Sequence, residues 1–300
     1  MSLSHDVFER YQQAGKIAKE VRAEMRHFVR EGIPIIDVCE RAEELIRQKG
    51  GQPAFPCNVS INEVAAHYTS PPADKGIIPQ KSLVKVDIGA HVDGYIADTA
   101  VTVSFSREHE NLIQAAEEAL RVAVNMTYAG ISTSRLGATI QRTIKTYGCK
   151  PVSNLTGHKV GRYMIHAGKS IPNVSHVLGS KIREGEVVAI EPFVTLANAA
   201  GKVKDGDQAT IFRYVRRRSL NNPYAKRLLS RIETSFRTLP FSERWLIGIV
   251  PQENYHTAFH DLLRSKCIMP YYVFVEASGK PVAQAEHTVL VVKDGCKVLT

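Results

Sequence analysis

The sequence predicts an α+β fold with an inserted helical segment, and three observations support this interpretation. Helix and strand patterns follow one another in the order helix, helix, hairpin, helix, helix, loop, strand. Between residues 204 and 276 the pattern becomes charged and helical, and after this segment it returns to strands. The chain has 300 residues, which is enough for a large core in one or two domains.

Two helices are expected at the start of the chain. Residues 4–30 contain few helix breakers and carry apolar residues at helical spacing, which predicts a long amphipathic helix. Gly32 and Pro34 end this helix, and residues 35–48 form a second one that closes at Gly50.

A β-hairpin is expected next, because the apolar, β-rich runs 83–90 and 95–104 flank the turn signal HVDG. The same patterns predict the remaining elements of the main unit: helices at 107–128 and 134–147, a loop rich in glycine and histidine, and strands at 186–195 and 282–292.

The segment 204–276 holds over half of the net charge. The whole chain has a formal net charge of +9, and this segment contains 12 basic and 7 acidic residues, a net of +5. Helical stretches are predicted at about 223–236, 241–248 and 253–266. We therefore expect a main unit of residues 1–203 and 277–300 and an inserted helical subdomain of residues 204–276. Its basic run Arg216–Arg218 is compatible with nucleic-acid contact or with solubility alone.

The composition is that of an ordinary globular protein, with 44% hydrophobic and 23% charged residues. No apolar run approaches the roughly 20 residues of a membrane span, and the polar N-terminus has no apolar core of a secretory signal. We expect no membrane association. The five cysteines are widely spaced and form no CxxC motif, which argues against a disulfide framework and favours a reducing cytoplasm.

Two aspartates lie in the predicted hairpin, where a charge is costly. If Val92 and Asp93 form the turn, Asp87 faces Asp98 directly; if Asp93 and Gly94 form it, they are diagonal neighbours. In both registers they share one face, because side chains alternate with a period of two. Such a close pair either shares a proton or holds a cation. The alternative is that both aspartates lie on a solvated face.

Two glutamates occur in similar surroundings. Glu191 ends the apolar strand pattern of GEVVAIEPFV, and Glu286 lies inside that of PVAQAEHTVLVV. A lone glutamate in an apolar strand is rare unless it is paired. Together with Asp87 and Asp98 they make four candidate buried carboxylates, which two divalent cations would balance.

Histidine supplies a candidate nitrogen ligand. His158 and His166 lie in TGHKVGRYMIHAG, and His67 lies in NEVAAHYTS. Taken singly, each is more often a structural or surface histidine, and it is the four carboxylates that favour a site. Oxygen-rich sites with one imidazole suit Mn²⁺, Fe²⁺, Co²⁺ or Zn²⁺, and carboxylate-bridged pairs of metals are typical of hydrolases.

The ordered contexts KVDIG, IADTA, GHKVG, AIEPF and QAEHT resemble the metal-ligand motifs of the methionine aminopeptidases. The phrases NEVAAHYT and IHAGKSIPNV and the insertion before the last glutamate resemble the type 2 subgroup, and the short N-terminal region is similar to its archaeal members. The resemblance implies a pita-bread fold, in which two αβ halves related by a pseudo-twofold enclose a dinuclear metal site. It also implies that the insertion is a winged-helix-like subdomain.

The resemblance implies a role for each matching residue. Two divalent ions (Co, Mn, Fe(II) or Zn) would be held by five ligands, namely Asp87, Asp98, His158, Glu191 and Glu286. A bridging water or hydroxide would be the nucleophile, and Glu191 would act as general base. His67 and His166 would contact the scissile amide, and Phe55 and Ile165 would form the pocket for the methionine side chain.

The implied activity is removal of the initiator methionine from nascent polypeptides with a small second residue, by a cytoplasmic monomer. Two alternatives share this fold. One is an X-Pro peptidase, which usually carries a large domain before the first aspartate, whereas only 86 residues precede Asp87 here. The other is a non-catalytic protein that binds nucleic acid or the ribosome, although such relatives have lost metal ligands. Ribosome association through the basic insertion is also compatible with catalysis.

Overall fold

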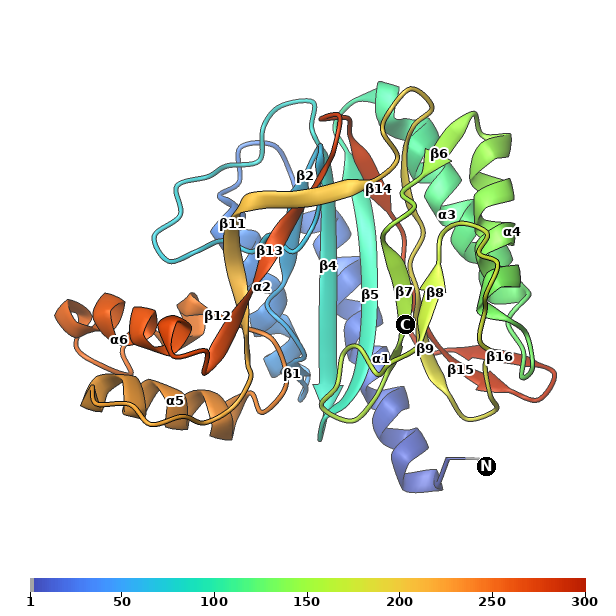
Figure 1. The fold of residues 1–300 in the computed structure, drawn as a ribbon. Coiled ribbons are helices and arrows are strands. Elements are labelled where there is room, and N and C mark those ends of the chain that lie inside the picture. The colour runs from blue at the N-terminus through green and yellow to red at the C-terminus, as the bar shows by residue number, and fades with distance from the viewer. Residues whose placement is uncertain (1–2) are drawn as a thin grey trace.

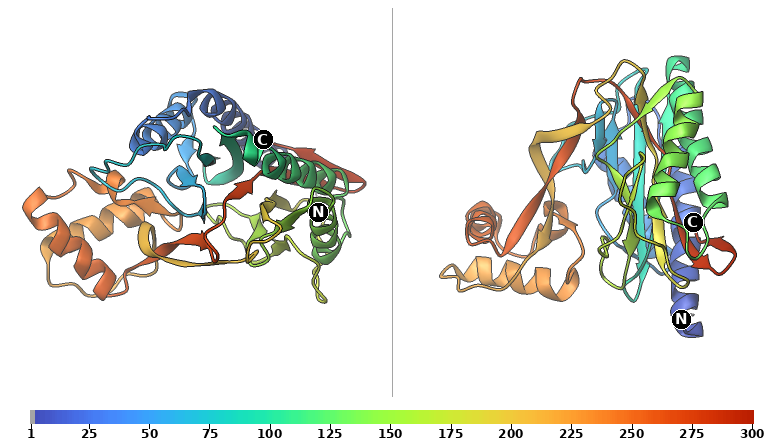
Figure 2. Two further views of the ribbon diagram at one scale, coloured as in Figure 1. Left: turned by 90° about the horizontal axis from the view of Figure 1, so that it is seen from above. Right: turned by 45° about the vertical axis from the view of Figure 1, so that its right-hand side comes forward.

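The computed structural model describes residues 3–300 and shows a layered arrangement of helices and sheets (Figure 1). Helices α1 (His5–Phe28) and α2 (Ile35–Gln48) precede the central hairpin, and α3 (Glu110–Asn125) and α4 (Thr133–Thr146) follow it. In the right-hand view of Figure 2, α1, α3 and α4 run along one side of the strands, while α5 (Pro223–Ser235) and α6 (Gln252–Arg264) project on the other side. None of the helices in the described part of the chain has the length and apolarity needed to cross a lipid bilayer.

The first half of the molecule packs α1 and α2 against the hairpin of β4 (Leu83–Val92) and β5 (Tyr95–Ser104). Strands β1 (Gln52–Pro53) and β2 (Asn58–Ile61) pair with β4 on its other edge. The helices present apolar residues at helical spacing to the sheet, and these form one continuous buried cluster with the hairpin. The predicted helices 4–30 and 35–48 and the hairpin are confirmed.

The second half repeats this arrangement with α3 and α4. A second buried apolar cluster joins these helices to short strands. Those strands form two antiparallel sheets among residues 3–300, one of β6 (Cys149–Pro151), β10 (Phe193–Leu196) and β14 (Val282–Gln284), the other of β7 (Thr156–Val160), β8 (Ser170–Pro172), β9 (Val187–Ile190), β15 (His287–Val292) and β16 (Gly295–Val298). The predicted helix at 107–128 is divided into a 3-10 turn, η1 (Arg107–His109), and α3.

The hairpin register settles the alternatives left open by the sequence. Val92 pairs with Tyr95, so Asp93 and Gly94 form the two-residue turn, both with positive φ as a type I′ turn requires. Asp98 therefore lies opposite Gly89, and Asp87 lies opposite Ala100. The two aspartates are diagonal neighbours on one face.

The inserted segment differs from the prediction at both ends. Residues 204–214 belong to strand β11 (Val203–Tyr214) and residues 268–276 form β13 (Ile268–Glu276). These two strands pair with each other, and β13 also pairs with β3 (Val64–Ala66). The predicted helix 241–248 is wrong, because the chain there forms the short strand β12 (Phe241–Ser242) and a 3-10 turn, η2 (Glu243–Leu246). Helices α5 and α6 are confirmed and share a third apolar cluster. The division into units 1–203 with 277–300 and 204–276 stays a prediction.

Candidate metal centre

A single cavity of about 470 Å³ is lined by all nine residues that the sequence analysis singled out. Four carboxylates and one imidazole reach it from both halves of the molecule. Asp87 comes from β4, Asp98 from β5 and His158 from β7. Glu191 follows β9 directly, and Glu286 lies between β14 and β15.

The two glutamates sit where the chain passes from one sheet to the other. Ile190 pairs with His287 and Phe193 pairs with Gln284, so both pairings follow the same register. In that register Glu191 and Glu286 are opposite each other, in the gap between the two sheets. The predicted strands 186–195 and 282–292 are therefore each interrupted at the candidate ligand, and the interruption turns both carboxyl groups into the cavity.

Threonine hydroxyl groups fix the distance between the halves, and sequence reasoning missed them. The hydroxyl of Thr288 accepts a hydrogen bond from Asp98 N and donates one to Asp98 O, both at 2.8 Å. The hydroxyl of Thr102 bonds in the same way to Gln284 N (2.9 Å) and Gln284 O (2.6 Å). A third hydroxyl, that of Thr99, donates to Glu286 O at 2.8 Å. The sequence feature that could have indicated them is a threonine within a run of apolar strand residues.

The candidate ligands lie close together. His158 Nε2 is 3.5 Å from Asp98 Oδ2 and 3.4 Å from Glu191 Oε1. Asp98, His158 and Glu286 each offer one ligand atom, and these three atoms lie within 4.8 Å of one another. Asp87 and Glu191 line the same cavity outside that group of three.

The four carboxyl groups are largely removed from water and lack nearby positive charge among the described residues, and this raises their pKa values. Burial raises the pKa of Asp87 to about 7. Burial, followed by the mutual repulsion of the carboxylates, holds the pKa values of Asp98, Glu191 and Glu286 well above their usual range. Burial also lowers the pKa of His158 to about 3, so its imidazole is neutral and free to ligate a cation.

The donor set fits divalent metal ions. Within the described residues, Asp87 Oδ1, Asp98 Oδ1 and Glu286 Oε1 are buried and have no hydrogen-bond partner. A buried carboxylate oxygen without a partner is unfavourable. Cations coordinated by these atoms would both satisfy them and neutralise the cluster.

The remaining predicted residues form the walls of the cavity. Phe55 and Ile165 are apolar and each only 7% exposed. The His158 and His166 rings are edge to face, with centroids 4.5 Å apart. His67 lies against Phe274 at 4.6 Å and has φ +66°, and burial lowers its pKa to about 4. The structure thus brings together every predicted site residue.

Comparisons of the sequence and of the structure with known proteins agree with each other. The family model of metallopeptidase family M24 matches residues 9–238. The methionine aminopeptidase of Methanothermobacter thermautotrophicus is 45% identical over 98% of this chain and 99% of its own length. Among solved structures, a thermophilic Arx1 has a TM-score of 0.84 at 21% identity, covering 99% of this chain and 91% of its own. A methionine aminopeptidase from Thermotoga maritima has a TM-score of 0.72 at 22% identity, covering 100% and 98%.

The two structural matches show that the chain has the pita-bread fold. At 21% and 22% identity they show the fold alone. The match to the Methanothermobacter thermautotrophicus enzyme covers nearly the whole of both chains, and its 45% identity is about twice that of the structural matches. The chain therefore belongs to the methionine aminopeptidases of metallopeptidase family M24.

Proposed function

We propose that this chain removes N-terminal methionine from polypeptides with the help of divalent metal ions in the cavity of Asp87, Asp98, His158, Glu191 and Glu286. The observation that carries the proposal is the cluster of buried carboxylates with unpartnered oxygens beside a neutral imidazole. Two divalent ions match the charge of four carboxylates, and cobalt, manganese, iron(II) and zinc all suit this donor set. Metal ions in such a site lower the pKa of water and polarise a carbonyl group.

The residues around the cluster supply the other requirements of peptide hydrolysis. Glu191 takes the proton of the attacking water and passes it to the leaving amine. It borders the cavity, and its Oε1 lies 3.4 Å from His158 Nε2. His67 and His166 border the same cavity and can donate hydrogen bonds to the amide that is cleaved.

Specificity for methionine comes from the apolar end of the cavity. Phe55 and Ile165 give a wall that suits an unbranched thioether. Preference for a small second residue, restriction to chain ends and a monomeric state belong to the same proposal. The free thiols, four of them buried, fit a reducing cytoplasm.

The test is an assay of metal-stripped protein on Met-Ala-Ser, with Mn²⁺, Co²⁺, Fe²⁺ or Zn²⁺ added back. Wild type and Asp98→Ala are compared, and an Ala-Pro peptide serves as the alternative substrate. We expect free methionine only with metal and only in wild type. Cleavage of the Ala-Pro peptide instead would favour the X-Pro peptidase, and no release with any metal would favour a non-catalytic binding protein.

The basic insertion suggests a second contact, with the ribosome. Arg216, Arg217 and Arg218 are all exposed, and Arg217 forms an ion pair with Glu233. Arg218, Arg264 and Lys266 border one surface hollow, and such clusters bind phosphates by non-specific electrostatics. Co-sedimentation with ribosomes at two salt concentrations, for wild type and for Arg216→Gln with Arg218→Gln, tests this. Equal sedimentation of both proteins would remove the support for a ribosome contact.

A further inference from the structure

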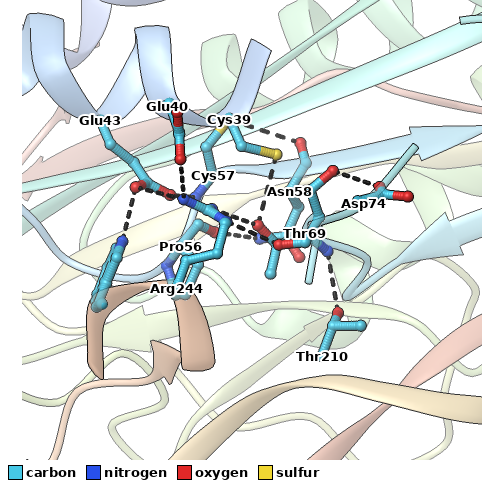
Figure 3. A network of polar contacts seen from close by, with 12 residues as sticks. Cys39, Glu40, Glu43, Pro56, Cys57, Asn58, Thr69, Asp74, Thr210 and Arg244 are labelled. Carbon is cyan, nitrogen blue, oxygen red and sulfur yellow. Dashed lines mark hydrogen bonds and ion pairs between the residues drawn. The ribbon is translucent and has the colours of Figure 1, made fainter. Parts of the chain in front are cut away.

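A buried ion pair joins the insertion to helix α2. Arg244, in η2, and Glu43, in α2, have side chains only 5% and 2% exposed. Arg244 Nη2 is 2.8 Å from Glu43 Oε1, and Nη1 is 3.2 Å from Oε2 (Figure 3). Trp245 Nε1 donates to the same carboxylate at 2.7 Å. Each charge is the nearest counter-charge of the other, since Glu40 lies 4.0 Å from Arg244 and Arg47 lies 4.0 Å from Glu43. Charges this deeply buried need such a partner.

The same guanidinium also binds the loop that follows β3. Arg244 Nε donates to Ser70 O at 2.7 Å, and Nη2 donates to the Thr69 hydroxyl at 3.0 Å. Thr69 N donates in turn to the Thr210 hydroxyl of β11 at 3.2 Å. Figure 3 shows Thr69 between Arg244 and Thr210. The loop is therefore tied to the insertion at two successive residues.

This loop carries His67 into the cavity in a strained conformation. His67 has φ +66°, a region that a residue with a Cβ adopts only when its surroundings hold it there. It lies two residues before Thr69 and three before Ser70. Its ring faces the reaction cavity and packs against Phe274. A change in the path of residues 68–70 would therefore move the imidazole directly.

We infer that Arg244 is a positioning residue, which holds His67 at the reacting amide through Ser70 and Thr69, with Glu43 as its fixed anchor. The inference rests on the proposed function, since it takes His67 to contact the substrate. It gives the insertion a part in catalysis although Arg244 itself touches neither substrate nor metal. Glu43 also accepts from Cys57 N at 3.2 Å, so one carboxylate anchors both the loop and the segment before β2.

The experiment removes both charges at once so that no unpaired buried charge remains. The variant is Arg244→Met with Glu43→Gln, in which glutamine still accepts from Trp245. The matched control is Arg217→Met with Glu233→Gln, an Arg–Glu pair of the same insertion with an arginine side chain 66% exposed. A second variant, Thr69→Val, leaves the ion pair intact and removes the hydroxyl group that accepts from Arg244 and donates to Cys39 Sγ at 3.5 Å.

Two measurements are made on each protein. Backbone hydrogen exchange of residues 62–74 in metal-free protein reports the loop without any activity. Steady-state kinetics on Met-Ala-Ser with Mn²⁺ reports kcat and KM separately. We expect faster exchange in this peptide and a kcat about 10- to 100-fold lower, with KM changed by less than about threefold, because a histidine that acts in the transition state is displaced. Thr69→Val should show the same pattern more weakly, and the control should match wild type.

Exchange in residues 62–74 equal to that of wild type would overturn the inference, and so would an unchanged kcat. His67→Ala separates the two levels of the argument. If His67→Ala lowers kcat while the Arg244 and Glu43 double variant does not, the inference fails and the proposed function stands. If both retain full kcat, the role of His67 in the proposed function fails as well. A rise in KM alone, with kcat retained, would also overturn the inference.

Discussion

At the scale of single residues, Asp98 shows how a charge is retained in an apolar strand. Its side chain is buried, and its backbone N–H and C=O are both bound by the Thr288 hydroxyl of the other half. The backbone is thus fixed from outside its own sheet, while the carboxylate is left to face the cavity. Because Asp98 is held by its backbone, both of its carboxylate oxygens stay available for the proposed metal ions.

The first prediction concerns Thr288→Val. This change leaves two buried backbone groups of Asp98 unpaired, which should lower the free energy of unfolding by about 1–3 kcal/mol. Thr102→Val is the matched control, because Thr102 makes the same two bonds to Gln284, which is not a predicted ligand. Calorimetric titration of metal-free protein with Mn²⁺ should show affinity reduced about tenfold in Thr288→Val and less in Thr102→Val. Equal affinities in the two variants would contradict the role given to Thr288.

The second prediction concerns pH. The pKa of Asp87 is about 7 in the folded chain, well above its usual value, so the folded state binds the proton more tightly. The stability that this provides is complete at low pH and is lost as the pH rises through 7. His67 and His158 have the opposite sign, since burial lowers their pKa values to about 4 and about 3 while an unfolded histidine is still half protonated at about pH 6.5. Their contribution is the same in an Asp87→Asn variant.

The free energy of unfolding of metal-free protein, from urea titration, should therefore contain a loss of about 1 kcal/mol between pH 6.5 and 8.5 from Asp87. Burial lowers the pKa of Lys85 to about 7, so Lys85 makes the free energy of unfolding rise with pH over this range. This contribution is the same in an Asp87→Asn variant. The difference between the two proteins isolates the aspartate. A fall just as large in Asp87→Asn would show that Asp87 is already ionised or exposed.

At the scale of elements, the hairpin of β4 and β5 carries more than ligands. Gly89 lies opposite Asp98, and a Cβ on Gly89 would be only 2.2 Å from Cε1 of Phe55. The glycine of KVDIG therefore leaves room for Phe55 in the wall of the cavity, where we propose that methionine binds. Strand β4 thus carries both a proposed metal ligand, Asp87, and the residue that leaves room for Phe55.

The third prediction follows from this contact. Gly89→Ala should push the Phe55 ring out of place, lower the free energy of unfolding by about 1–3 kcal/mol and raise KM for Met-Ala-Ser. Gly295→Ala is the control, because nothing lies within 4 Å of a Cβ at that position. Urea titration and steady-state kinetics on both variants measure the two effects. An unchanged KM in Gly89→Ala would show that Phe55 does not line the substrate pocket.

The hairpin could be predicted from the sequence because its apolar runs, its turn and its period of two agree. The pairing register could not, since HVDG allows two turns and only the positive φ of Asp93 and Gly94 decides between them. The strands β11 and β13 were missed for local reasons. β11 begins with the polar run VKDGDQ and β13 contains Pro270, so both resemble loops in the sequence. They form strands because they pair with each other, and β13 pairs in addition with β3.

The site, too, could be predicted from the sequence only in part. Four carboxylates in apolar strands were visible in the sequence because burial of a charge is costly. The threonines at 99, 102 and 288 were not, because a hydroxyl group in a strand is common and its partner lies nearly 200 residues away. Arg244 was hidden for the same reason, since nothing near it in the sequence indicates Glu43.

At the scale of the whole molecule, the insertion touches the two histidine loops at separate points. Arg244 binds the loop of His67, and the Thr238 hydroxyl donates to Tyr163 O in the loop that leads to His166. The Arg237 guanidinium also lies over the Tyr163 ring, 4.3 Å from its centroid. The segment between α5 and α6 thus contacts both loops, and its Pro240 lines the cavity.

The last prediction compares the two Arg–Glu pairs of the insertion by double-mutant cycles. Arg244→Met or Glu43→Gln alone leaves one buried charge without its partner, so each should lower the free energy of unfolding by about 3–5 kcal/mol. The two changes together should cost less than their sum, because neither charge is then left behind. The exposed pair of Arg217 and Glu233 should show a coupling of only about 0–1 kcal/mol, since solvent screens it. Urea titrations of the seven proteins, wild type included, give both couplings. Equal couplings for the two pairs would mean that water reaches Arg244, and the buried pair would then contribute no more than a surface ion pair to attaching the insertion.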